Sequence, residues 1–299
     1  MKKILLFLSY FLCVSNMFSQ NTISLEYSIN KQDLTATVIS SSGWHVPGSI
    51  VIPSTYEEQG ITYQVIAIGE RAFFSCSGLT SITLPKSIIT IGENAFDECT
   101  RLTSINIPDN VTTIGKSAFE GCPLTSITLP AKLTSIESKI FAYCSHLSSI
   151  TIPENITKIE TDAFFSCTNL TSVTLPSSLK TIEYDAFMRC PLEHVYCFAT
   201  EPPTYNGTSF ISGNNKCTLH IPHGCLSNYT NASIAKGFTT IIDDIFPTNI
   251  ELTTTEKNAT VDIRYLTLDG KPANAQTKGT LIKQTLSKDK IVNTEKIRN

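Results

Sequence analysis

Cysteine and histidine are the residues of this sequence whose types and spacing could support chemistry. Six of the ten cysteines each follow, by three residues, a phenylalanine that recurs along the chain. These cysteines are Cys76, Cys99, Cys122, Cys144, Cys167 and Cys190, and the phenylalanines are Phe73, Phe96, Phe119, Phe141, Phe164 and Phe187. Such a series could form disulfides, bind a metal or act as redox thiols. Because each cysteine lies one full repeat from the next, we favour a column of buried free thiols that pack as small apolar groups.

A second group is the segment CTLHIPHGC, which places Cys217, His220, His223 and Cys225 within nine residues. Cysteine and histidine are the ligands that zinc prefers, but this spacing differs from that of zinc fingers. A Cys217–Cys225 bridge is the stronger alternative in an exported protein. Alternation along the strand points His220 away from Leu219. We interpret the four residues as unpaired parts of a cap, with the bridge and the metal site as open alternatives.

The sequence contains no recognisable catalytic grouping. The remaining histidines, His45, His146 and His194, do not recur, and neither a G-x-S-x-G segment nor a phosphate-binding loop occurs. We therefore expect no enzyme, no cofactor and no metal site.

The cysteines belong to a repeat of 22–23 residues whose clearest element ends in proline. Its copies are LTSITLP (79–85), LTSINIP (102–108), LTSITLP (124–130), LSSITIP (147–153) and LTSVTLP (170–176). The alternation of apolar and polar residues predicts a half-buried strand, which proline ends because it has no amide to donate. Segments such as VTTIG predict a second short strand, and ENAFDEC predicts a brief helical turn. A fixed period of this length indicates a solenoid, in which stacked units bury the apolar side that one unit alone would expose.

Two rows of side chains follow from these strands and form our candidate partner-binding face. The serine row comprises Ser81, Ser104, Ser126, Ser149, Ser172 and His194, and the threonine row comprises Thr83, Asn106, Thr128, Thr151, Thr174 and Tyr196. Serine and threonine also simply suit exposed strands. Binding hot spots favour tyrosine, tryptophan and arginine. We therefore favour the His194–Tyr196 end and the loop 202–210, with exposed Tyr196 and Tyr205, as the binding edge.

The repeat, read as AF..C..LTSITLP..(V/I)T.IG, resembles the BspA-like class of bacterial leucine-rich repeats over residues 66–200. In the better-known leucine-rich pattern Asn or Cys follows the strand, whereas here the cysteine precedes it by three residues. The resemblance implies a leucine-rich repeat solenoid, β-rich with short helical turns and capped at both ends. It also implies adhesion or recognition, with host matrix proteins, other bacteria or surface glycans as partners.

The flanking segments complete the expected domain organisation. Residues 20–65 resemble the family's entry, a β-hairpin cap with a first irregular repeat, and residues 201–247 resemble its exit cap, with a short helix near Tyr229. Residues 248–299 predict a small all-β unit. This unit resembles the C-terminal sorting domains of type IX secretion in Bacteroidetes at Gly270, Lys271, Lys278, Gly279 and Lys296, which implies contact with the secretion machinery. It departs from them at Thr280 and Leu281, where a tyrosine is usual.

Charge and the N-terminus indicate export and exclude nucleic acid. Residues 1–19 carry Lys2 and Lys3, then an apolar run, which is typical of a signal peptide and short for a membrane span. Lipid attachment at Cys13 is an alternative. Residues 21–250 have a net charge of −8 and residues 251–299 one of +3, and a mildly acidic body does not suit nucleic acid. We expect a secreted or outer-surface protein that presents a recognition face. A structural envelope component and a polysaccharide-binding accessory protein are the alternatives.

Overall fold

The computed structural model describes the backbone of residues 25–41, 48–207, 217–245, 261–267, 272–273, 280–287 and 290–298. Side chains are described up to residue 245, apart from residues 40 and 41. The predicted signal peptide and the residues Gly270, Lys271, Lys278 and Gly279 lie outside the described residues.

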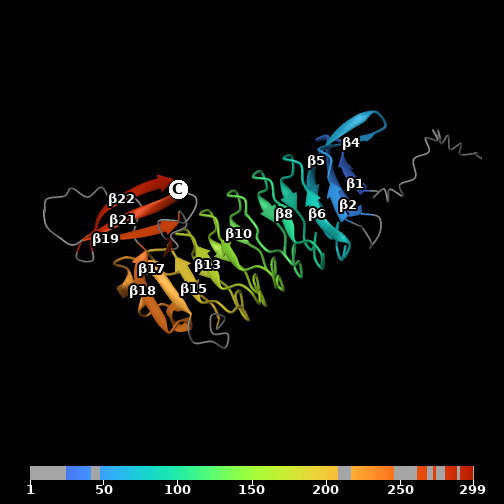
Figure 1. The fold of residues 1–299 in the computed structure, drawn as a ribbon. Helices are drawn as coiled ribbons and strands as arrows, with labels where there is room; N and C mark the ends of the chain where they lie inside the picture. Colours follow the sequence, from blue (N-terminus) through green and yellow to red (C-terminus); the bar gives the residue numbers. More distant parts are fainter. Residues whose placement is uncertain are drawn as a thin grey trace, which may run out of the picture.

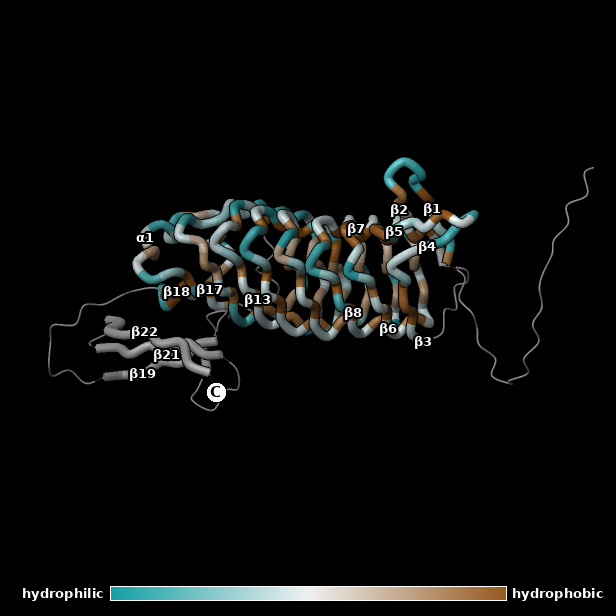
Figure 2. Tube along the Cα trace, turned by 90° about the horizontal axis from the view of Figure 1, so that it is seen from above, coloured by the Kyte–Doolittle hydropathy of each residue, from teal (hydrophilic) through white to brown (hydrophobic). Residues whose placement is uncertain are grey.

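Short parallel strands stack into a solenoid with two β-sides, as the repeat predicts (Figure 1). The first side contains β3 (Gly48–Val51), β6 (Leu79–Thr83), β8 (Ser104–Asn106), β11 (Ser149–Thr151), β13 (Ser172–Leu175), β15 (His194–Cys197), β17 (Thr218–Pro222) and β18 (Thr240–Ile245). The second side contains β2 (Thr35–Ser41), β5 (Ile61–Ile68), β7 (Thr90–Ile91), β9 (Thr113–Ile114), β10 (Ser135–Ile136), β12 (Lys158–Ile159), β14 (Thr181–Ile182) and β16 (Thr204–Tyr205). Figure 2 shows β5 and β7 opposite β6 and β8.

The alternation in each repeat explains which side chains form the core. In β6, Leu79 and Ile82 are buried and Thr83 is exposed. The register pairs Ile82 with Ile105 of β8, so like residues of successive repeats stack on each other. Each repeat buries the apolar side chains of the next one, and the core therefore runs the length of the solenoid between the two β-sides.

The segments that we expected to make brief helical turns, such as ENAFDEC, are turns without helix. Each contains residues with positive φ, for example Asn94 at 52° and Glu98 at 58°. Left-handed residues interrupt a right-handed helix, and the backbone amides bond across repeats instead, as from Phe73 N to Ala95 O at 2.8 Å. Within the described residues, helix is limited to α1 (Leu226–Tyr229) and the 3₁₀ turn Ile234–Gly237.

The third repeat interrupts both β-sides. The sheet of the first side ends at β8 and restarts at β11, and that of the second side ends at β9 and restarts at β10. The predicted strand 124–130 is accordingly absent, although Thr125 N still bonds to Thr103 O at 3.2 Å. This repeat has one residue fewer than its neighbours, with Pro123 between Cys122 and Leu124. Ile127 of this repeat is only partly buried.

Separate elements close the two ends of the solenoid. At the N-terminal end, β1 (Leu25–Asn30) pairs with β2 in an antiparallel hairpin, and β4 (Thr55–Glu58) pairs with β5. At the C-terminal end, α1 buries Tyr229, whose hydroxyl donates to Ala199 O at 2.6 Å. These elements cover core residues that an open end would expose to water.

The chain continues from β18 into a four-stranded antiparallel sheet. Its strands are β19 (Val261–Thr267), β20 (Pro272–Ala273), β21 (Thr280–Ser287) and β22 (Lys290–Arg298), in the order β20-β19-β21-β22. Residues 248–299 thus contain the β-structure that their alternation predicts.

Candidate interaction face

The six repeat cysteines lie inside the solenoid and form no disulfide. All six are buried. The thiol of each later cysteine donates to the carbonyl oxygen of a phenylalanine in the preceding repeat. These distances are Cys99–Phe73 3.1 Å, Cys122–Phe96 3.1 Å, Cys144–Phe119 3.2 Å, Cys167–Phe141 3.1 Å and Cys190–Phe164 3.0 Å. The neighbouring thiol of Cys122, together with burial, raises the pKa of Cys99, and burial raises the pKa of Cys144. These protonated thiols are poor nucleophiles and poor metal ligands.

The six phenylalanines form a second internal column beside the thiols. Their rings are fully buried and stack with centroid distances between 5.1 and 5.8 Å. The longest of these distances joins Phe119 to Phe141, at the shortened repeat. Both columns therefore hold successive repeats together and present nothing to a ligand.

The segment CTLHIPHGC does not bring its four chemical side chains together. Cys217 and Cys225 are both free, so the bridge that we held open is not formed. His223 is exposed and its Nδ1 lies 3.7 Å from Asp243 Oδ2. His220 is buried and faces β15 and β18. Among the described residues, no group of three or more His, Cys, Asp or Glu side chains is placed to hold a metal ion.

The two outward rows lie side by side on the first β-side. Register pairs Ser81 with Ser104 and Thr83 with Asn106. Later in the row it pairs Ser149 with Ser172, and Ser172 with His194. The exposed members are Thr83, Ser104, Asn106, Ser126, Thr128, Ser149, Thr151 and His194, while Ser81 and Ser172 are partly exposed. This face is thus polar and accessible through the first four strand copies, including the third copy that lacks a regular strand.

The far end of the face differs from our expectation. Tyr196 is only 7% exposed, Thr174 only 5%, and Tyr205 only 6%. Alternation correctly predicts that Thr174 and Tyr196 point away from the core. Val173 and Val195, which directly precede them in their strands, are fully buried inside the core. The prediction of an exposed Tyr196 was wrong, because alternation gives the face on which a side chain lies but not what covers that face. The prediction of an exposed Tyr205 was wrong for another reason: Tyr205 lies in β16 on the second β-side, in register with Ile182, and packs in the core.

A hydrogen-bonded chain of three side chains crosses this end of the face. His194 Nδ1 lies 3.1 Å from His220 Nε2, and His220 Nδ1 lies 3.0 Å from both carboxylate oxygens of Asp244. Because an ionised carboxylate only accepts, His220 Nδ1 donates to Asp244, and in the neutral ring Nε2 then accepts from His194. Tyr196 stacks on His220 at 4.5 Å. The sequence did not predict this contact, since residues 194, 220 and 244 meet only through strand order.

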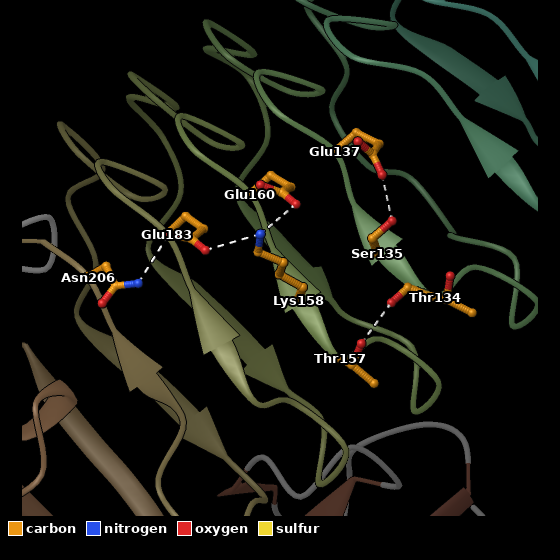
Figure 3. Close-up of polar contacts among 8 residues, drawn as sticks. All are labelled: Thr134, Ser135, Glu137, Thr157, Lys158, Glu160, Glu183 and Asn206. Atoms are coloured by element: carbon orange, nitrogen blue, oxygen red, sulfur yellow. Dashed lines mark hydrogen bonds and ion pairs between the residues drawn. The ribbon is translucent and has the colours of Figure 1, made fainter.

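The second β-side carries a different polar row, which sequence reasoning did not single out (Figure 3). Lys158 Nζ lies 3.0 Å from Glu160 and 3.1 Å from Glu183, whose other carboxylate oxygen accepts from Asn206 at 3.1 Å. These contacts lower the pKa of Glu183, with the Asn206 bond as the main cause. The signal in the sequence was the change from IG in the early repeats to IE in the later ones. Because these charges pair with each other, the row offers fewer free groups to a partner than the first side does.

Comparisons with known proteins agree with this architecture. Residues 66–193 match the model of the BspA type leucine rich repeat region in six copies. A leucine rich cell surface protein from Faecalibacterium prausnitzii is 32% identical, with a TM-score of 0.59 over 70% of this chain and 55% of that chain. A leucine-rich repeat protein of T. pallidum is 28% identical, with a TM-score of 0.54 over 61% of this chain and 83% of that chain. This chain therefore spans about half the length of the first relative.

No curated protein matches the sequence significantly. No helix in the described part of the chain is long and apolar enough to cross a membrane.

Proposed function

We propose that this chain, whose residues 66–193 are BspA-type leucine-rich repeats, is an exported protein that binds extracellular proteins or surface glycans through the first β-side. One observation carries the proposal: the serine and threonine rows present accessible polar side chains on β6, β8 and β11 and on the third copy between β8 and β11. Solenoids use such extended surfaces for binding, since each repeat adds one more pair of side chains to the face.

The remaining features support recognition rather than catalysis. The repeat cysteines are buried, and the charges of the second side pair with each other. The relative from Faecalibacterium prausnitzii is described as a cell surface protein. We infer outer-surface or extracellular localisation from this relative and from the predicted signal peptide, and we propose that residues 248–299 act as a type IX sorting domain.

The test is binding of the purified protein to an array of matrix proteins and glycans. The informative variant is Asn106→Lys, which places a long charged side chain in the middle of the threonine row. Its matched control is Thr113→Lys, an exposed position of β9 on the opposite side. We expect saturable binding to one class, weakened at least tenfold by Asn106→Lys and unchanged by Thr113→Lys.

Two results would oppose the proposal. Equal loss of binding in both variants would place the contact elsewhere or indicate a general effect on the fold. Absence of binding across the array, with a normally folded protein, would favour a structural component of the cell envelope.

A further inference from the structure

The threonine row changes abruptly from exposed to buried as it crosses the first β-side. Register continues the row from Thr151 through Thr174 and Tyr196 to His220 and Ile242. Thr151 is exposed, the next three side chains are 5%, 7% and 6% exposed, and Ile242 is again 40% exposed. We call Thr174, Tyr196 and His220 the covered end of the row. These side chains lie on the outer surface of the sheet, because the intervening Val173, Val195 and Leu219 fill the core.

Contacts within the row explain only part of this burial. Tyr196 stacks on His220, and His220 bonds to Asp244. Thr174, by contrast, has a hydroxyl that is buried and has no hydrogen-bond partner among the described residues. Burying a hydroxyl without a partner is unfavourable, so native proteins rarely leave one unpaired. The covered end thus has the properties of a surface in contact with another part of a protein.

We propose that the occupant is the chain's own C-terminal segment, residues 246–299. This segment begins directly after β18, the strand that carries Ile242 at the end of the same row. Its described residues form a four-stranded sheet, and a sheet of this size needs a second layer to bury its apolar face. The covered end therefore supplies the layer that the C-terminal sheet requires.

Charge supports the same occupant. Residues 251–299 have nine basic and six acidic side chains, a net charge of +3. The surface next to the covered end is acidic, with Glu193 exposed and Asp243 and Asp244 partly exposed. Opposite charges steer two such surfaces together and favour one orientation. A consequence, which rests on the proposed function, is that the C-terminal segment covers the aromatic end of the recognition face.

The experiment measures the solvent accessibility of Tyr196 by hydroxyl-radical oxidation. A specific protease site is inserted between residues 246 and 260 of the full chain, and oxidation is compared before cutting and after removal of the released segment. Tyr184, 61% exposed, is the internal reference. We expect the oxidation rate of Tyr196 to rise at least threefold after release, while that of Tyr184 stays constant. An unchanged rate for Tyr196 would overturn the proposal.

A second measurement separates the C-terminal segment from other occupants and needs no cut. In the full chain, Thr174→Lys introduces a positive charge against the basic segment, and Thr128→Lys makes the same change at an exposed position of the row. We expect faster proteolysis of residues 246–299 in Thr174→Lys alone, with an unchanged circular dichroism spectrum. Equal proteolysis in both variants, or protection of Tyr196 that disappears on dilution, would show that the segment is not the occupant and would favour a second copy.

Discussion

Replacement of Gly92 by alanine tests how closely the early repeats approach each other. A Cβ at this position would lie 2.6 Å from Glu70 N, 2.6 Å from the carbonyl carbon of Gly69 and 2.9 Å from its oxygen. All three atoms belong to the backbone of the preceding repeat, so a side-chain rotation cannot relieve the contact. The two repeats would have to separate by several tenths of an ångström.

The expected cost follows from two opposing effects. Overpacking in a close-packed interior costs about 1–3 kcal/mol. Alanine also restricts the unfolded chain, which offsets about 0.4–1 kcal/mol. We expect a net destabilisation of roughly 1–2 kcal/mol, or a fall in the thermal midpoint of roughly 2–8 °C for a domain of this size.

The assay is thermal unfolding followed by circular dichroism, with urea unfolding as the second method. The matched control is Glu160→Ala, at the corresponding position of a later repeat, where a side chain already occupies the site. This variant loses one exposed contact to Lys158, and ion pairs of this kind contribute little to stability. If Gly92→Ala melted at the same temperature as Glu160→Ala, the reasoning from close backbone contact would be refuted.

Two further predictions concern a carboxylate and the C-terminal segment. Partial burial, with repulsion from Glu120 and Glu98, raises the pKa of Asp97 from 3.8 to about 6. The folded state therefore binds the proton more tightly than the unfolded state, and the cost of the charged form grows as pH rises from 3.8 to about 6. Asp97→Asn should raise the thermal midpoint by roughly 1–3 °C at pH 7.5, after allowance for solvent screening, and leave it unchanged at pH 3.5. The exposed Asp109→Asn serves as the control. An equal shift of the midpoint at both pH values would contradict the prediction. Deletion of residues 248–299 should retain the protein in the periplasm if these residues are a sorting domain, as measured by cell fractionation, and normal surface display would reject that role.

Local patterns in the sequence predicted most of the architecture. The proline-ended LTSITLP copies, at a spacing of 22–23 residues, were sufficient to predict a solenoid with stacked strands. Alternation also predicted which side chains point inward, because a strand places successive side chains on opposite faces whatever its surroundings. The missing residue of the third repeat was visible too, but its effect on both sheets was not, since strand pairing depends on the neighbouring repeats.

The candidate face depended more strongly on tertiary structure. No local pattern joins His194 to His220 and Asp244, which meet because β15, β17 and β18 are adjacent in one sheet. Nor does a pattern of alternation distinguish Thr151, which is exposed, from Thr174, which is buried in the same row. Alternation determines only the face on which a side chain lies. Whether water or another part of the chain covers that face is decided by contacts between segments distant in sequence. The sequence of the repeat does not predict these contacts.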